Sequence, residues 1–438
     1  MTTHISIPYH QSSMDADIPT RQLRAILCPS HPHGCGTSSP SLLSQQASVN
    51  QALDLPIGSR RLEDLAAGKK TATVITSDHT RPVPSRITLP LLLARLRKGN
   101  PDIDIRILVA TGCHRAPTAD EMRAKFGAEV VASETFILHD CEDRDSLRHL
   151  GQLPSGGALW LNTHALDTEL LIAEGFIEPH FFAGFSGGRK SVLPGIAGRQ
   201  TVLANHCSAF IADPHARAGS LDHNPLHRDM LFAAERARLA FILNVTLNAD
   251  KSIRAAFAGH PEKAHAEGCR QMAQSVTVQG LKADIVITSN GGYPLDQNIY
   301  QAVKGMTAAE ACCEEGGTII MVAGCSDGHG GEGFYRDLSN AESPQALLKQ
   351  ALEVPQEKTP PDQWEYQILA RILSKHRVIL VTGLCDPSLI RKMHMQHAAT
   401  LPEAIRMALS SSGPDARFVV IPDGVSVIVA KPCERQDV

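Results

Sequence analysis

The 438-residue sequence is poor in aromatic side chains and has no long apolar run. Aromatic residues make up 4% of the chain, which leaves few stacking platforms for single-stranded nucleic acid or sugars. Lys and Arg number 42 against 46 Asp and Glu, and the basic residues are scattered, so nothing favours nucleic-acid binding. The sequence shows neither an export signal nor the roughly 20 apolar residues of a membrane-spanning helix. We therefore expect a cytoplasmic enzyme that acts on a small molecule, with no nucleic-acid or membrane partner.

Several motifs of metal and nucleotide chemistry are also missing. The chain has no C-x-x-C knuckle, no H-E-x-x-H zinc-peptidase pattern and no G-x-G-x-x-G immediately at the end of a predicted strand. The run GFSGGRKS approaches a P-loop, but Arg189 stands where the glycine before the lysine belongs. The 11 cysteines are odd in number and irregularly spaced, so we expect reduced thiols. A two-domain nucleotide-dependent oxidoreductase of another kind stays as an alternative.

The first 50 residues have a partly irregular pattern. They are rich in Ser, Pro, Gln and His, which indicates a strand mixed with loop segments. The run CPSHPHGC, residues 28–35, places two His between two Cys. The Pro and Gly around them are more typical of an irregular loop than of a metal site.

From residue 69 onward, short β-branched runs alternate with amphipathic helical stretches. TATVIT, DIRILVA and LLIAEGFI form one series, and DIVITS, TIIMVAG, VILVTG and RFVVIPD form a second that begins near residue 282. Near-continuous apolar strands between helices predict an α/β fold with mainly parallel sheets flanked by helices. We place two domains at 1–275 and 276–438. The last run, RFVVIPDGVSVIVA, predicts two strands around an Asp-Gly turn, and these strands could pack on either domain.

Polar side chains of the types that catalysis uses follow the predicted strands. In parallel sheets, ligands bind beyond the carboxyl ends of the strands, so we expect these residues to line an active site in a cleft between the domains. The candidates in chain order are Asp78, Arg81, His114, His180, Lys190, His206, Gln301 and Lys304.

The residue types suggest roles for several candidates. A lysine in a glycine-rich turn is typical of anion binding. Histidines that follow strands or glycine-rich turns suit either metal ligation or proton transfer near neutral pH. Gln301 and Lys304 lie three residues apart in a predicted helix, so both can address one carboxylate. Asp78 and Arg81 could instead form a local ion pair at a helix start.

Together these motifs resemble the lactate racemase family. Its members share SDHTRP, a TG-x-H turn, EPH-x-x-AGFSGG-x-K, an NH dipeptide and NGGYPLDQN-x-YQ-x-VKG. The chain has SDHTRP, TGCHR, EPHFFAGFSGGRKS, ANHC and NGGYPLDQNIYQAVKG in the same order, and the similarity runs from about Leu53 to Arg406. The resemblance implies an isomerase that racemises or epimerises a 2-hydroxyacid, either lactate or a related 2-hydroxycarboxylate.

The resemblance also implies a cofactor. This is the nickel-pincer nucleotide, a pyridinium-3,5-bisthiocarboxylate mononucleotide that holds nickel through sulfur and carbon. The family pattern assigns the covalent tether to Lys190 and the nickel ligand to His206, with Asp78 and Arg81 beside the cofactor. Cofactor-biosynthesis enzymes are then expected as partners for maturation.

The implied mechanism is proton-coupled hydride transfer. His114 and His180 match the family's two acid/base histidines, and Arg81, Gln301 and Lys304 match groups that bind the substrate. One histidine takes the hydroxyl proton while hydride leaves the α-carbon for the pincer. The resulting 2-keto acid then accepts hydride on its other face.

The chain departs from the family pattern in minor ways. Cys113 precedes His114 and Cys207 follows His206, so thiol oxidation is expected to disturb the site. Residues 30–48 match the family poorly, and the particular 2-hydroxyacid stays open. A cofactor-free relative acting as a binding protein is a second alternative, but it would lack at least one of the tether, ligand and acid/base residues, and all are present.

Overall fold

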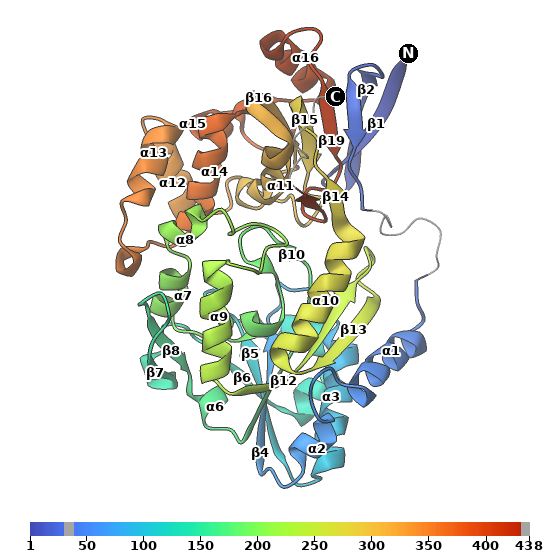
Figure 1. The fold of residues 1–438 in the computed structure, drawn as a ribbon, viewed down its shortest axis with the longest axis vertical. Coiled ribbons are helices and arrows are strands. Elements are labelled where there is room, and N and C mark those ends of the chain that lie inside the picture. Colours follow the sequence, from blue (N-terminus) through green and yellow to red (C-terminus); the bar gives the residue numbers. More distant parts are fainter. Residues whose placement is uncertain (30–38, 431–438) are drawn as a thin grey trace. The chain divides into compact units, whose positions relative to one another are not determined.

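The computed structural model describes residues 1–29 and 39–430, and it confirms the α/β fold expected from the sequence (Figure 1). The chain forms two compact units. The described parts of the N-terminal unit are residues 39–205 and 215–272, and those of the C-terminal unit are 1–29, 206–214 and 273–430. No helix in these ranges is long and apolar enough to cross a membrane. Most of the run CPSHPHGC, with both its histidines, lies outside the described residues.

A six-stranded sheet forms the centre of the N-terminal unit. Its strands in spatial order are β13 (Ile253–Gly259), β12 (Leu239–Leu247), β9 (Leu170–Phe176), β4 (Thr71–Ser77), β5 (Asp104–Ala110) and β6 (Thr135–Leu138). The pair β12 and β13 is antiparallel, and the other neighbouring pairs are parallel. β9 is buried at every position, which explains why its sequence reads as a nearly continuous apolar run.

Helices pack against this sheet through evenly spaced leucines. In α3 (Ser85–Gly99), Leu89, Leu92 and Leu96 recur every three or four residues and are fully buried, which contributes about 1.5–3 kcal/mol for each side chain. The same core includes residues of α1 (Leu42–Asp54), α2 (Leu62–Ala66) and α4 (Ala119–Phe126). Further helices of the unit are α5 (Ala128–Ser133), α6 (Thr163–Leu166), α7 (Arg199–Asn205), α9 (Pro225–Arg236) and α10 (Pro261–Val276), which ends just past the unit boundary. Two short antiparallel pairs accompany them, β7 (Leu147–Gln152) with β8 (Ala158–Asn162) and β10 (Pro179–His180) with β11 (Gly184–Phe185).

The C-terminal unit has a parallel six-stranded sheet of its own. Its strands in spatial order are β18 (Gln396–Ala398), β17 (Arg377–Val381), β16 (Cys313–Val322), β15 (Ala283–Ser289), β19 (Phe418–Ile421) and β3 (Leu23–Ile26). The hairpin of β1 (Thr2–Tyr9) and β2 (Ser12–Pro19) shares a core with this sheet and with α16 (Leu401–Ser412). Helix α11 (Ile299–Cys312) packs on β15 and β16, and α14 (Gln363–Lys375) packs on α11. Further helices are α8 (Ser208–Ala212), α12 (Glu332–Asn340), α13 (Pro344–Leu352) and α15 (Pro387–Lys392).

The beginning of the chain differs from its sequence-based prediction. Residues 2–26 form three strands rather than one strand with loops, and they belong to the C-terminal unit instead of a domain spanning 1–275. In β1 the side chains of Ile5 and Ile7 alternate with exposed residues, and a strand with one apolar face must cover another apolar surface. That surface belongs to the C-terminal sheet, and β3 adds to its edge beside β19.

The end of the described chain also differs from its prediction. β19 and β20 (Ile428–Ala430) do not pair as a hairpin around the Asp-Gly turn. β19 lies between β15 and β3, and β20 pairs in parallel with β14 (Thr277–Gln279). Asp423 accepts hydrogen bonds from the N–H groups of Val425 and Ser426, which hold an irregular turn. This turn leads the chain away from β19 to the strand β14. Both strands belong to the C-terminal unit.

Candidate active site

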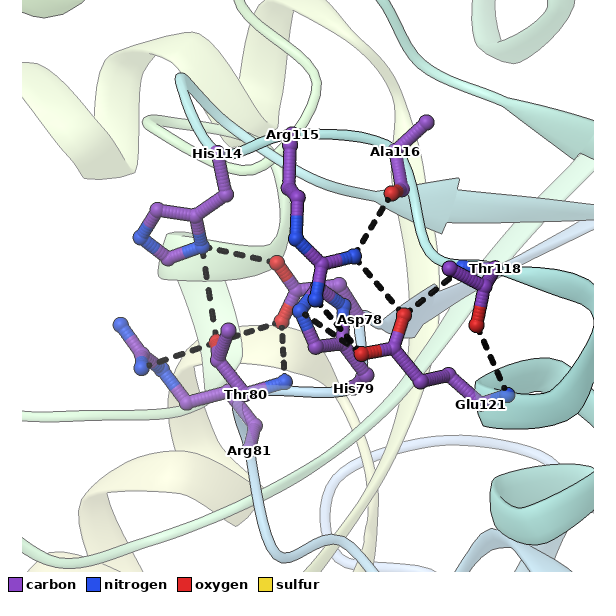
Figure 2. A network of polar contacts seen from close by, with 9 residues as sticks. All are labelled: Asp78, His79, Thr80, Arg81, His114, Arg115, Ala116, Thr118 and Glu121. Atoms are coloured by element: carbon purple, nitrogen blue, oxygen red, sulfur yellow. Dashed lines mark hydrogen bonds and ion pairs between the residues drawn. The ribbon is translucent and has the colours of Figure 1, made fainter.

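The first cluster of candidate residues lies where β4 and β5 end. These strands are parallel neighbours, so the residues that follow their carboxyl ends come together. Asp78 follows β4 directly, and His114 follows the turn after β5. Nδ1 of His114 lies 2.7 Å from Oδ2 of Asp78 (Figure 2). The fold thus joins two motifs that are 36 residues apart in the sequence.

The carboxyl group of Asp78 is buried and ionised. Burial alone would raise its pKa, but hydrogen bonds from His114 and Thr80 more than offset burial and lower the pKa to about 2. Thr80 donates its backbone N–H over 3.0 Å and its hydroxyl over 2.6 Å to Oδ1 of Asp78. An ionised carboxylate only accepts hydrogen bonds. Nδ1 of His114 therefore carries the ring proton and donates a hydrogen bond to Asp78, which leaves Nε2 as an acceptor.

This arrangement prepares His114 to act as a base. The side chain of His114 is 45% exposed, and its second ring nitrogen points away from Asp78 (Figure 2). When Nε2 takes a proton, the ring becomes an imidazolium cation beside the Asp78 carboxylate, which stabilises it. A fixed tautomer with a buried anion behind it is the arrangement of a histidine general base.

Arg81 does not form the local ion pair with Asp78 that the sequence left open. Within the described residues, Asp78 pairs with His114, and the Arg81 guanidinium donates to the Thr80 hydroxyl over 3.1 Å. The side chain of Arg81 is exposed, and its backbone carbonyl accepts a hydrogen bond from Lys125. Burial lowers the pKa of Lys125 to about 8, although the carboxylates of Glu174 and Asp78 oppose the shift. Arg81 and Lys125 thus place positive charge beside the Asp78 and His114 pair.

A second set of contacts fixes the loop that carries His114. The guanidinium of Arg115 donates two hydrogen bonds, of 2.8 and 2.6 Å, to the carboxylate of Glu121 (Figure 2). Glu121 also forms a capping box with Thr118 at the start of α4. The loop after β5 is therefore tied to the helix that follows it, which limits the motion of the adjacent imidazole.

His180 lies in β10 and has the opposite hydrogen-bonding state. Its Nδ1 accepts a hydrogen bond of 3.3 Å from the backbone N–H of Ala183, so the neutral ring carries its proton on Nε2. The ring stacks on Phe181 and meets Phe182 edge-on, with centroids 5.1 and 4.6 Å away. His180 therefore presents a donor in an aromatic setting, whereas His114 presents an acceptor in a polar one.

Lys190 lies in a tight turn, in the 3₁₀ segment η2 (Gly188–Ser191). Its Nζ is 5.9 Å from the ring centroid of Phe182, so Lys190 and His180 approach the same aromatic side chain. Gly187 has a φ of 78°, and a Cβ there would lie 2.7 Å from Oδ1 of Asn244. Only glycine suits this position. Oδ1 of Asn244 also accepts the N–H of Gly188 over 2.7 Å, which fastens the turn to β12.

Arg189 explains why the turn departs from a P-loop. Its side chain is 1% exposed, and the guanidinium donates to the carbonyls of Ala183 at 2.7 Å and Phe185 at 2.8 Å. It also donates to Nδ1 of His227 at 2.9 Å and contacts Nε2 of His265 at 3.1 Å. Burial lowers the pKa of Arg189 to about 10, so the group is still a cation at neutral pH. Arg189 is the internal brace of the loop that carries Lys190.

His206 follows α7 and belongs to the C-terminal unit. Its side chain is buried, and its ring meets Trp364 edge-on with centroids 5.2 Å apart. The indole N–H of Trp364 donates to the Tyr300 hydroxyl over 3.1 Å, and that hydroxyl donates to Asp362. Aromatic packing therefore fixes the orientation of the imidazole. The described residues contain no group of three His, Cys, Asp or Glu side chains that could hold a metal ion.

Gln301 and Lys304 share one face of α11, as their spacing predicts. Nζ of Lys304 donates to Oε1 of Gln301 over 2.6 Å, which confirms that the side chains meet. Because Oε1 is occupied, the amide NH₂ of Gln301 is directed away from the ammonium. The carboxyl group of Glu365 is buried close enough to Lys304 to interact with it; burial raises the pKa of Glu365 to about 8, although Lys304 opposes the shift. One face of α11 thus presents two donors of the kind that bind a carboxylate.

Family models match both halves of the chain. The lactate racemase N-terminal domain matches residues 9–219, and the lactate racemase C-terminal domain matches residues 278–429. The chain belongs to the lactate racemase family. It is therefore an enzyme of the isomerase class.

Relatives of this family member are similar over nearly their whole length. The lactate racemase of Thermoanaerobacterium thermosaccharolyticum is 54% identical over 426 residues, which cover 97% of this chain and 99% of the relative. The lactate racemase of Lactiplantibacillus plantarum is 52% identical over 425 residues, with the same coverage. A solved structure of the T. thermosaccharolyticum apoprotein gives a TM-score of 0.94 at 53% identity, covering 98% of this chain and all of that one. A Thermotoga maritima protein shares only the fold, with a TM-score of 0.63 at 18% identity over 90% of this chain.

Several residues around the lactate racemase motifs escaped the sequence reasoning. Thr80 and Arg189 lie inside recognised motifs but have roles that depend on contacts made after folding. Glu174 is a buried carboxylate that accepts hydrogen bonds from the hydroxyl groups of Thr76, Ser85 and Thr88. The single acidic residue in the apolar run LLIAEGF was the signal that could have revealed it, because a buried charge needs partners. Trp364 gave no comparable signal.

Proposed function

We propose that the protein interconverts the two enantiomers of a 2-hydroxyacid, with lactate as the first candidate. The proposal is supported by two relatives named lactate racemase that are more than 50% identical to this chain over almost its full length. The observation that carries it is that the two candidate histidines have opposite tautomers. Nε2 of His114 is an acceptor backed by Asp78, and Nε2 of His180 carries a proton.

The two histidines divide the handling of the hydroxyl proton. His114 removes the proton from the substrate hydroxyl through Nε2, and the Asp78 carboxylate stabilises the resulting cation. His180 donates a hydrogen bond through Nε2 to the same oxygen when the other face reacts. Full proton donation requires a proton on both of its nitrogens, so the 3.3 Å contact from Ala183 must open. That contact is long enough to be weak. His180 can therefore change its protonation state, while Asp78 keeps His114 in one tautomer.

The carboxylate of the substrate would be bound by residues of α11. The ammonium of Lys304 and the amide NH₂ of Gln301, which lie on one face of the helix, are the two proposed donors to this carboxylate. The exposed guanidinium of Arg81 is proposed as a further donor to substrate or cofactor. Holding the carboxylate limits the motion of a planar 2-keto acid between the two half-reactions.

The residues present fit the nickel-pincer nucleotide as cofactor. Lys190 offers a primary amine on a rigid glycine turn, to which the cofactor could be tethered as a thioamide. Asp78 and Arg81, which follow the strand β4, are the residues proposed to lie beside the cofactor. His206 offers an imidazole whose orientation is fixed by its contact with Trp364, and imidazole is a donor that suits nickel together with sulfur ligands. When bound, the group supplies the acceptor and donor for the substrate's hydride. Enzymes that build this cofactor are then the partners needed for maturation.

The function is tested with single enantiomers. Enzyme made together with the cofactor-building enzymes is incubated with one enantiomer of lactate and of several larger 2-hydroxyacids, and products are separated by chiral chromatography. We expect approach to an equal mixture for at least one substrate. His114→Ala and His180→Ala should each lose this activity, whereas His149→Ala, at an exposed position, should keep it. Loaded enzyme that racemises no 2-hydroxyacid would reject the proposal.

The tether is tested by intact-mass spectrometry. Enzyme matured with the cofactor should carry an added mass, and Lys190→Ala should lack it. Lys251→Ala removes an exposed lysine of the same unit and should keep it. An adduct that persists in Lys190→Ala would place the attachment elsewhere.

A further inference from the structure

Two thiols face each other beside the loop that carries His114. Cys113 lies three residues beyond the end of β5, and Cys141 lies three residues beyond the end of β6. These strands are parallel neighbours. Each of the two thiols shifts the pKa of the other, which indicates that their sulfur atoms lie close together. A disulfide spans a Cα separation of about 4.4–6.8 Å, and both cysteines follow the carboxyl ends of strands that are hydrogen-bonded to each other.

The backbone around both thiols is held in place. The hydroxyl of Thr111 donates to the carbonyl of His139 over 2.6 Å, which ties the two strand ends together. The carbonyl of Cys141 accepts the N–H of Arg199 over 3.0 Å. Cys141 is buried, and Cys113 is partly exposed, so solvent reaches the pair at Cys113.

The two thiols differ in acidity. The hydrogen bond from Cys113 lowers the pKa of Cys141 to about 7, with burial opposing and the Arg199 guanidinium assisting. The same hydrogen bond, together with burial, raises the pKa of Cys113. One sulfur is thus partly thiolate at neutral pH and the other keeps its proton, which is the combination of an attacking and a resolving thiol.

We propose that Cys113 and Cys141 form a redox modification site that closes to a disulfide with hydrogen peroxide. The Cys141 thiolate attacks one peroxide oxygen, the O–O bond breaks, and hydroxide leaves to become water with the proton that Cys141 released. The sulfur of Cys113 then attacks the Cys141 sulfenic acid, the S–S bond forms, and the S–O bond breaks. The oxygen leaves as a second water with the Cys113 proton. Two thiols lose two electrons, and one peroxide is reduced to two waters.

Closing the disulfide would alter the position of His114. The N–H of His114 donates to the carbonyl of Thr111, and its ring reaches Asp78 over 2.7 Å. A disulfide at Cys113 pulls on the backbone directly before His114, and so on the residue that these two hydrogen bonds hold. A misplacement of about 1 Å can cost on the order of 100-fold in rate. This effect on activity rests on the proposed function, but the disulfide chemistry does not.

The experiment separates the two parts. The full-length protein is treated with hydrogen peroxide, with and without later dithiothreitol, and is analysed by intact mass and by peptide mapping under non-reducing conditions. We expect a mass lower by two hydrogen atoms, a linked peptide pair containing Cys113 and Cys141, and reversal by dithiothreitol. In cofactor-loaded enzyme, racemisation of lactate should fall at least about tenfold on oxidation and recover on reduction.

Variants distinguish this pair from general oxidation. Cys113→Ser and Cys141→Ser should each prevent the linked peptide, and the oxidised and reduced forms of Cys141→Ser should have equal rates. Cys325 and Cys385 are the matched control, because burial raises the pKa of both thiols; Cys385→Ser should leave the linked peptide unchanged. Failure to form the Cys113–Cys141 link overturns the proposal whatever the enzyme does. A link that forms without a loss of rate overturns only the effect on His114.

Discussion

Replacing Asp78 by Asn changes the charge behind His114 while keeping the size of the side chain. Oδ1 of Asp78 accepts two donors from Thr80, and Oδ2 accepts Nδ1 of His114. Asn has one oxygen, and Thr80 offers it two hydrogen bonds. The amide NH₂ of the variant then faces Nδ1 of His114 and donates to it. The ring proton moves to Nε2, where the base function is needed.

The size of the effect follows from that exchange of tautomer. A general base contributes on the order of 100- to 10,000-fold to a rate, and a histidine in the wrong tautomer loses most of that contribution. We therefore expect kcat/KM of the Asp78→Asn variant to fall by about 1,000-fold. Because enantiomers have equal free energy, kcat/KM must fall equally for both directions, which provides an internal check.

The assay follows chiral conversion from each enantiomer with enzyme of measured cofactor content, so that loading and chemistry are separated. Asp120→Asn is the matched control, since Asp120 is exposed on α4 and pairs with Arg123; it should change the rate less than about twofold. The double variant of Asp78→Asn with His114→Ala should be no slower than His114→Ala alone. A fully loaded Asp78→Asn enzyme that keeps its rate within about threefold would refute the assigned tautomer.

Four further results are expected. Arg189→Met should lower the free energy of unfolding in urea by about 3 kcal/mol, because two buried carbonyls lose their donors. A decrease below about 0.5 kcal/mol would contradict the role of Arg189 in holding the loop of Lys190. Gly187→Ala should cost about 1–3 kcal/mol through strain and collision, whereas Gly151→Ala, with a similar positive φ but open space, isolates the strain alone. His206→Ala should lose nickel by elemental analysis of matured enzyme, and retained nickel would move the ligand elsewhere. The lowered pKa of Asp78 stabilises the fold fully above pH about 4, and about 2 kcal/mol should be lost as the pH falls from about 4 to about 2; acid unfolding of Asp78→Asn should lack this part.

Much of the fold and of the candidate site was accessible from the sequence. Continuous apolar strands between amphipathic helices predict parallel sheets, because both faces of such strands are buried, and β4, β5 and β9 lie where these runs are. Ligand-binding residues in such sheets follow strand ends, which is why Asp78 and His114 could be selected without coordinates. The spacing of Gln301 and Lys304 predicts their contact, since three residues along a helix return to the same face.

Features that depend on contacts between distant segments of the chain were decided only by the tertiary structure. The opposite tautomers of His114 and His180 come from different partners, an aspartate carboxylate and a backbone N–H, and no local pattern specifies them. The hairpin β1–β2 covers the C-terminal sheet because its apolar face needs an apolar surface, whatever its place in the chain. The pairing of Cys113 with Cys141 likewise follows from the order of strands in a sheet. A sequence determines which groups are available, whereas hydrogen-bond partners and burial, set only on folding, determine their protonation and charge.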